Sequence, residues 1–180
     1  GYGGSCFPKD VKALTKIAEE NGYTAELITA VEQVNDAQKL VIAQKIVKRF
    51  GEDLTGLTFG IWGLSFKPGT DDMREAPAIY VIKELVKRGA KIKAYDPKAI
   101  NEAKEHYLKG VQNITYVTSK YDVLNNSDAL VLLTEWKEFR SPDFDKIKSL
   151  LKSPIIFDGR NQYIVYDLEN KGLEYYRIGK

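Results

Sequence analysis

The sequence predicts an α/β protein in which a long helical segment precedes a Rossmann-like domain, a parallel sheet with helices on both faces. In the first fifty residues, apolar positions recur at helical spacing. From residue 57 onward, short apolar runs alternate with helical patterns, as they do in doubly wound sheets. The stretch GEDLTG at 51–56 separates the two patterns. We therefore expect a helical segment at 1–53 and a sheet domain at 54–180.

The helical segment is expected to contain two helices. Pro8 suits a first helical turn and Asn21-Gly22 ends the pattern, which predicts a helix over 8–21. A second pattern runs over 24–50 without Gly or Pro, and a helix of that length spans roughly 40 Å. It either lies across its own domain or is buried partly against a second subunit. We favour a homodimer through helix 24–50, because so short a chain has little else to cover it.

The sheet domain is expected to alternate strands and helices. Runs such as LTFGIWG, ALVLL and PIIF are short, apolar and bounded by turn residues, which indicates buried strands. Strands are predicted at 57–63, 91–95, 114–117, 129–133, 154–157 and 173–176, and helices at 75–88, 98–109, 119–126 and 142–151.

Composition excludes several classes of function. A net charge of +2 gives no electrostatic case for nucleic acid or for an anionic membrane surface, and no apolar run is long enough to span a membrane. One cysteine allows neither an internal disulfide nor a cysteine-rich metal site, and its solitary use favours the cytoplasm. The only histidine, His106, lies in the charged stretch KEHYLKG and is expected on the surface.

The cysteine, Cys6, stands in the segment GYGGSCFPKD. A lone cysteine is usually a small buried residue, but here it follows three glycines and directly precedes a predicted helix. Lys9 and the amide groups at the helix start would favour the nucleophilic thiolate. From the residues alone, a nucleophile and an inert core thiol both remain open.

The first strand, helix and second strand, ending at Asp96, outline a dinucleotide-binding unit, but the glycine fingerprint is missing. Gly60, Gly63 and Gly69 are too widely spaced for G-x-G-x-x-G. We therefore do not expect a dinucleotide to bind at this turn in the usual way.

Loops at the carboxyl ends of parallel strands form the binding crevice of such folds. Lys67 and Arg160 follow two of the predicted strands and are suited to a phosphate, with Phe66 as a stacking face. The alternative is that the two cations merely pair with Asp71, Asp72 or Asp158.

Four separated stretches, GYGGSCFPKD, GLSFKPGTDDMREAP, TEWKEF and FDGRN, together resemble the NAD-dependent nucleotide-sugar 6-dehydrogenases over the whole chain. The resemblance implies a central dimerising segment followed by a Rossmann-like domain that holds the nucleotide sugar. It also implies that the NAD-binding domain precedes these residues and is not among them, so this chain alone is expected to be inactive.

The resemblance implies a role for each matching residue. Cys6 resembles the nucleophile that carries the substrate as a thiohemiacetal and then a thioester, and Asp10 resembles the acidic residue that activates water or handles protons. Gly3 allows the backbone to approach the sugar closely. The remaining matches concern ligands: Phe66 and Lys67 resemble the nucleotide contacts, Arg160 resembles the arginine that reaches the sugar or phosphate, and Arg74 resembles an arginine that reaches NAD.

The motifs identify the substrate less specifically than they identify the family. The FPKD ending and the KPGTDDMREAP loop favour UDP-glucose, with GDP-mannose as the alternative. A third possibility, from a different class, is a nucleotide-binding module without catalysis. Binding of UDP, UDP-glucose and GDP-mannose, measured by calorimetry, separates the base preferences.

Overall fold

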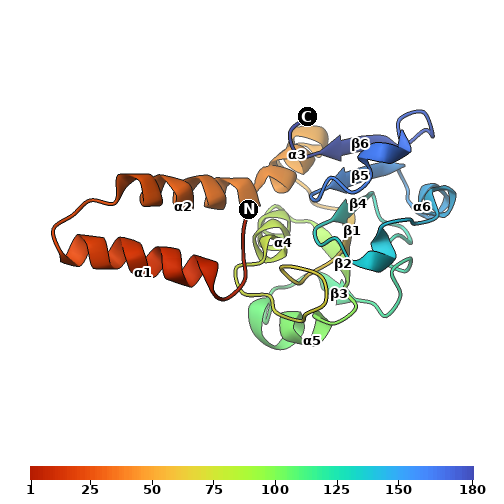
Figure 1. Cartoon of the computed structure of the whole chain (residues 1–180). Coiled ribbons are helices and arrows are strands. Elements are labelled where there is room, and N and C mark those ends of the chain that lie inside the picture. The colour runs from red at the N-terminus through yellow and green to blue at the C-terminus, as the bar shows by residue number, and fades with distance from the viewer.

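The computed structural model describes residues 1–180, and its centre is a single six-stranded sheet in the order β3-β2-β1-β4-β5-β6 (Figure 1). All neighbouring strands run parallel. The order reverses between β1 and β4, which is the switch point of a doubly wound sheet. The α/β fold class predicted from the sequence is confirmed, and each predicted strand is present. The strands are Thr58–Trp62 (β1), Lys91–Tyr95 (β2), Ile114–Tyr116 (β3), Ala129–Leu132 (β4), Ile155–Asp158 (β5) and Glu174–Arg177 (β6).

Helices cover both faces of the sheet. The six α-helices are Phe7–Glu20 (α1), Glu26–Lys39 (α2), Val41–Phe50 (α3), Pro77–Lys87 (α4), Ile100–Glu102 (α5) and Phe144–Leu150 (α6). A π-helical turn, Ala103–Tyr107, continues α5 within the helix expected at 98–109, and 3₁₀ turns lie at Lys137–Phe139 and Ile164–Tyr166. No helix is long and apolar enough to cross a membrane.

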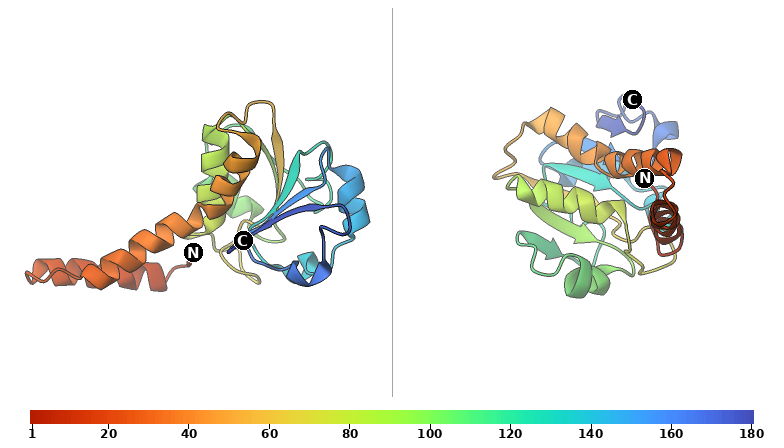
Figure 2. Two further views of the ribbon diagram at one scale, coloured as in Figure 1. Left: turned by 90° about the horizontal axis from the view of Figure 1, so that it is seen from above. Right: turned by 90° about the vertical axis from the view of Figure 1, so that its left-hand side faces the viewer.

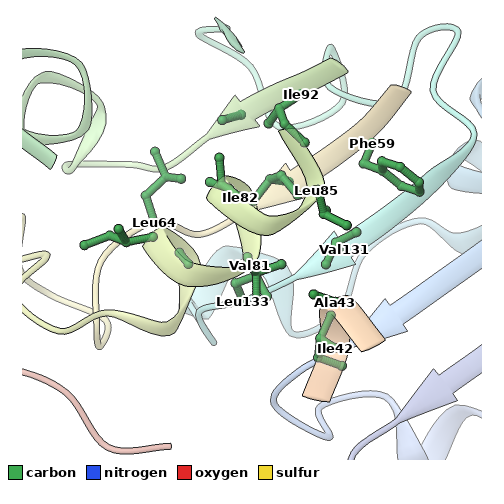
Figure 3. Close-up of a cluster of buried hydrophobic side chains, with 14 of the residues drawn as sticks. Ile42, Ala43, Phe59, Leu64, Val81, Ile82, Leu85, Ile92, Val131 and Leu133 are labelled. Carbon is green, nitrogen blue, oxygen red and sulfur yellow. The ribbon is translucent and has the colours of Figure 1, made fainter. Parts of the chain in front are cut away.

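The core lies on the two sides of the sheet because side chains alternate along each strand. Phe59 and Ile61 of β1 belong to the cluster beneath α3, α4 and α5, whereas Trp62 belongs to the cluster beneath α6. Figure 3 shows side chains of the first cluster gathered between α3, α4 and the strands. The four residues of β4 and of β5 are all buried, which explains why these strands appear in the sequence as continuous apolar runs.

The helix expected over 24–50 is interrupted, and this corrects the prediction of one continuous helix. The Leu40 N–H bonds to the carbonyl of Ala37, three residues back instead of four, at 3.1 Å. The two halves bury different surfaces, which accounts for a bend without Gly or Pro. Helix α3 places Ile42 and Ile46 in the core, whereas α2 extends away from the sheet domain (Figure 2).

The helix expected at 119–126 is absent, and a series of turns takes its place. One of them is closed by a bond from the Asp122 N–H to the Ser119 carbonyl at 3.1 Å. The turns insert Val123 and Leu124 into the core, both fully buried. A Cβ on Gly60 would come within 2.6 Å of the Val123 carbonyl oxygen. Close approach of this segment to β1 therefore replaces a covering helix.

Helices α1 and α2 form a hairpin that projects from the sheet domain (Figures 1 and 2). The tip is a Schellman-type turn: Gly22 has φ of 72°, and the Tyr23 N–H bonds to the Ala18 carbonyl at 2.9 Å. Only Pro8 in α1, and only Asn35 and Lys39 in α2, are buried. The hairpin is therefore held mainly at its base.

The base of the hairpin is held by an ionic cluster around Glu75, in the loop between β1 and α4. Lys39 of α2 donates to one carboxylate oxygen at 2.8 Å, and Lys12 of α1 donates to the other at 3.0 Å. Tyr80 of α4 also donates to Glu75, and the Lys39 ammonium lies 4.4 Å from the Tyr80 ring centroid. The Lys39 side chain is only 2% exposed, so its charge depends on these partners and on Asp36 of the same helix, at 3.1 Å.

The cluster also determines the ionisation of Glu75. Burial opposes ionisation of this carboxyl, but the hydrogen bonds from Lys39, Tyr80 and Lys12 outweigh burial and lower its pKa from 4.5 to about 2. Because the pKa is lower in the folded state, the stabilisation is present above the ordinary pKa and is lost as the pH falls towards 2.

We predict that Glu75→Gln lowers the free energy of unfolding at neutral pH by about 2–3 kcal/mol, because it leaves the buried Lys39 without its main counter-charge. The difference from wild type should shrink between about pH 5 and pH 2, where the wild-type carboxyl becomes protonated. Urea unfolding at a series of pH values measures both.

The matched control is Glu20→Gln, which removes the Glu20 carboxylate from an exposed contact with Lys16 at 4.0 Å. It should change stability by less than about 0.5 kcal/mol. Equal effects of the two substitutions would contradict the anchoring role of Glu75.

Candidate functional site

Hydrogen bonds to the backbone of Tyr2 and of Gly4 fix the cysteine segment. The side-chain amide of Asn35 in α2 accepts from the Tyr2 N–H at 2.6 Å and donates to the Tyr2 carbonyl at 3.3 Å. The Gly4 N–H donates to the Arg74 carbonyl at 2.7 Å. Residues far apart in the sequence thus bring the segment against the loop that follows β1.

The glycines of this segment are required by close packing. A Cβ on Gly3 would lie 2.5 Å from the Glu75 carbonyl oxygen, and a Cβ on Gly4 would lie 2.8 Å from the Phe66 ring. Gly4 also has φ of 90°, a conformation that residues with a side chain rarely adopt. The cysteine segment therefore lies directly on Phe66, one of the residues predicted to contact a nucleotide.

Cys6 stands at the N-cap position of α1, where its side chain makes no capping hydrogen bond. It is exposed, which contradicts the alternative of a buried core thiol. Its Sγ lies 3.5 Å from Ser5 Oγ. Asp10 follows one turn later, since its N–H bonds to the Cys6 carbonyl at 2.9 Å, but its exposed carboxylate pairs with Lys9 at 3.0 Å. Cys6 and Asp10 therefore lie at the same end of α1, one turn apart.

Arg160 lies at the centre of the crevice, where the exits of three strands converge. Its Nε donates to the Leu133 carbonyl at 2.8 Å and its Nη2 donates to the Phe66 carbonyl at 3.2 Å. Glu135 lies 3.0 Å from Nε. The sequence suggested Asp71, Asp72 or Asp158 as partners of Arg160, but its ion pair is with Glu135.

The other two cations predicted to bind ligands, Lys67 and Arg74, lie on the surface of the loop after β1. Lys67 is exposed, has no carboxylate within 4.0 Å, and lies 5.2 Å from the Phe66 ring centroid. Arg74 bonds to Asp72 through Nε and Nη2 and is also exposed. Lys67 is therefore free to meet an anion, whereas Arg74 would first have to leave Asp72.

Trp136 follows β4 within the TEWKEF motif and helps to fix the crevice. Its indole Nε1 donates to Asp96 at 3.0 Å, and the same carboxylate accepts from the backbone N–H of Leu64 at 2.7 Å and of Ser65 at 3.2 Å. Asp96 is 2% exposed. The TEW stretch thus connects the exits of β1, β2 and β4, a role that only the tertiary structure reveals.

The same contacts test the fit of NAD at the first strand-to-helix turn. The carboxylate at the end of β2, which binds a ribose in dinucleotide-binding folds, is here fully occupied by the protein's own donors. A Cβ on Gly63 would lie 2.4 Å from the Thr134 side chain, so Thr134 lies directly against the turn. These residues do not fit NAD, in agreement with the missing glycine fingerprint.

A cleft of about 260 Å³ opens beside Arg160, between the junction of α2 with α3, the start of α4 and the exits of β4 and β5. Its lining includes Lys39, Pro77, Leu133, Gly159, Arg160 and Asn161. A crevice at the carboxyl ends of the strands, next to the switch point, is where doubly wound folds bind their ligands.

Comparison with known families agrees with this geometry. Residues 60–164 match the sequence profile described as the UDP-glucose/GDP-mannose dehydrogenase family, UDP binding domain, and residues 1–37 match the central domain of the same family. The first match alone covers more than half of the chain. The chain belongs to this family.

Whole-chain relatives carry consistent names. The UDP-glucose 6-dehydrogenases of Pseudomonas aeruginosa and Rhizobium meliloti are 42% and 39% identical to it over its full length. The chain spans 40% of the length of each of these relatives. Family membership thus rests on the whole chain, which corresponds to only part of each relative.

Solved structures give the same result. A UDP-glucose dehydrogenase from Pyrobaculum islandicum superposes with a TM-score of 0.80 at 30% identity, over 98% of this chain and 37% of that one. An NDP-N-acetyl-D-galactosaminuronic acid dehydrogenase from Methanosarcina mazei superposes with a TM-score of 0.81 at 25% identity, over 100% of this chain and 38% of that one. In both structures the match therefore includes the hairpin as well as the sheet domain.

We predict that Gly4→Ala releases the cysteine segment from Phe66, because it adds both backbone strain and a methyl group where the ring lies. Strain of about 1–2 kcal/mol corresponds to roughly five- to thirtyfold faster amide hydrogen exchange in residues 1–10. Mass spectrometry of peptides from the exchanged protein measures this rate.

Gly22→Ala is the matched control, since Gly22 also has positive φ but a methyl group added there would meet no atom within 4 Å. Its strain stays at the hairpin tip, so exchange in residues 1–10 should not change. Unchanged exchange in Gly4→Ala would contradict the docking of the segment.

Proposed function

We propose that this chain is the dimerising and substrate-binding part of an NAD-dependent UDP-glucose 6-dehydrogenase, which oxidises the C6 alcohol of UDP-glucose to the carboxylate of UDP-glucuronate. The main support is the contact of Gly4 with Phe66, which joins the cysteine segment to the crevice of the UDP-binding domain. The names of the relatives that match the whole chain also support it.

The proposed chemistry explains why an exposed thiol lies beside a sugar-binding crevice. Oxidation of the alcohol gives an aldehyde, to which the Cys6 thiolate adds to form a thiohemiacetal. A second oxidation yields a thioester, and water then releases the acid and the thiol. NAD⁺ supplies the hydride acceptor for both oxidations. It is bound mainly outside residues 1–180, and Arg74 is the one residue here proposed to reach it.

The remaining residues bind and orient the substrate in this proposal. Arg160 and Lys67 offer donors and positive charge to the nucleotide, and Phe66 offers a ring face. Gly3 allows the backbone to lie against the sugar, and Asp10 handles the proton of the hydrolytic water. Residues 1–180 alone are expected to be inactive, because they provide no site for the hydride acceptor.

UDP-glucose is favoured over GDP-mannose by the curated relatives, which are named UDP-glucose 6-dehydrogenases at about 40% identity. A GDP-mannose dehydrogenase of Pseudomonas aeruginosa matches at 24% identity and a TM-score of 0.65, over 88% of the chain and 36% of its own. That likeness shows the fold, but it does not identify the nucleotide base that this chain binds.

We predict that Cys6→Ser in the full-length protein lowers formation of UDP-glucuronate by on the order of 10³-fold or more, because a hydroxyl is a far weaker nucleophile than a thiolate. Binding of UDP-glucose, measured by calorimetry, should change by less than about threefold. Product formation is measured chromatographically.

Ser5→Ala is the neighbouring control and should retain most of the activity. Full activity of Cys6→Ser would overturn the covalent route, and a wild-type protein that binds GDP-mannose but not UDP-glucose would overturn the substrate assignment.

We further propose that the protein is a homodimer through the segment 24–50, and that α2 provides the contact because α3 is already packed on the sheet. Leu27 and Val34 of α2 are 79% and 68% exposed, and Val31 lies between them on the same side. With Tyr2 they line an apolar groove of about 420 Å³. Apolar side chains gathered in this way mark an interface.

We predict that Val34→Asp in the full-length protein halves the molar mass measured by light scattering, because a carboxylate would be buried in the dimer contact. Val165→Asp is the matched control: Val165 is 83% exposed but lies on the sheet domain, so its substitution should leave the mass unchanged. A wild-type monomer at high concentration would contradict the proposed dimer.

A further inference from the structure

Three oxygen atoms surround the Arg160 guanidinium, and they come from the loops that follow β1 and β4. Two are the carbonyls of Leu133 and Phe66, which accept from Nε at 2.8 Å and from Nη2 at 3.2 Å. The third is the carboxylate of Glu135, with Oε2 at 3.0 Å from Nε. The single Nε hydrogen is directed at Leu133, so the contact with Glu135 is ionic and lacks a hydrogen bond.

This pair differs from the surface ion pairs of the chain. Arg74 bonds to Asp72 through both Nε and Nη2, and Arg49 bonds to Glu174 in the same bidentate manner. In those pairs the carboxylate occupies the donors of the guanidinium. Glu135 balances the charge of Arg160 without accepting a hydrogen bond, so Nε and Nη2 donate to the carbonyls of Leu133 and Phe66 instead.

Burial shows that the Glu135 contact is not incidental. Its Oε2 is excluded from solvent and receives no hydrogen bond. A buried carboxylate oxygen without a donor costs free energy, and the neighbouring positive charge of Arg160 is the available compensation. The Arg160 side chain is only 22% exposed, so the guanidinium has little freedom to turn elsewhere.

We propose that Glu135 is a positioning residue that fixes the Arg160 guanidinium so that Nη1 is presented to the nucleotide sugar. Nη1 makes no hydrogen bond within the chain, and Arg160 lines the 260 Å³ cleft. The identity of the ligand rests on the proposed function, whereas the arrangement of Glu135 and Arg160 does not.

The test uses the full-length protein, with UDP as the probe for binding and UDP-glucose as the substrate. Glu135→Gln removes the counter-charge with little change in shape, so the Arg160 guanidinium is held only by the carbonyls of Leu133 and Phe66. We expect the Kd for UDP and the KM for UDP-glucose to rise about tenfold, with kcat within about twofold. This division is expected because Arg160 contacts a part of the substrate that does not react. Glu135→Asp should give a smaller rise in Kd, because it keeps the charge.

A double-mutant cycle shows whether Glu135 acts through Arg160. In an Arg160→Lys background, Glu135→Gln should cause less than a twofold further change in the Kd for UDP. The matched control is Glu138→Gln, because Glu138 lies three residues away with an exposed contact to Tyr95 at 3.3 Å. It should leave the Kd for UDP and the KM for UDP-glucose unchanged.

The outcomes separate this inference from the proposed function. If the wild type binds UDP but does not oxidise UDP-glucose, the proposed function fails and the UDP titrations still decide the role of Glu135. The inference is overturned by an unchanged Kd in Glu135→Gln, by the same loss of affinity in both Arg160 backgrounds, or by a wild type that does not bind UDP.

Discussion

The buried charge of Lys39 constrains how the two parts of this chain meet. An ammonium group with 2% of its side chain exposed requires anions beside it, and Glu75 in the loop after β1 is the one that joins it to the sheet domain. In the same loop, the Arg74 carbonyl accepts a hydrogen bond from the Gly4 N–H, and the Phe66 ring packs against the cysteine segment. The ion pair that attaches the hairpin therefore also sets the position of the thiol relative to the crevice.

The crevice is organised by side chains that bind to the protein before they bind any ligand. Asp96 gathers the exits of β1, β2 and β4 by accepting from backbone amides and from the indole of Trp136. Arg160 connects the β1, β4 and β5 exits through the carbonyls of Phe66 and Leu133. A ligand entering here meets a surface whose polar groups are already oriented, which reduces the entropy lost on binding.

Much of the fold could be predicted from the sequence, because continuous apolar runs and turn residues mark buried parallel strands clearly. The break at Leu40 could not be predicted, because it depends on which surfaces of α2 and α3 pack against the rest of the fold. The turns at 119–126 have a helical pattern, but β1 lies too close for a helix, as Gly60 shows. Motif resemblance nominated Cys6 and Arg160, whereas the partner of Arg160 depends on tertiary geometry.

The internal occupation of Asp96 has a consequence for ligand selectivity. A doubly wound sheet whose second strand ends in an open carboxylate offers a hydrogen-bond partner to a ribose, and dinucleotides could then compete with the ligand of the neighbouring cleft. Here the carboxylate that would meet a ribose is closed off by amides and an indole. The doubly wound topology is kept, while the group that would attract a dinucleotide is withdrawn from solvent at this sheet.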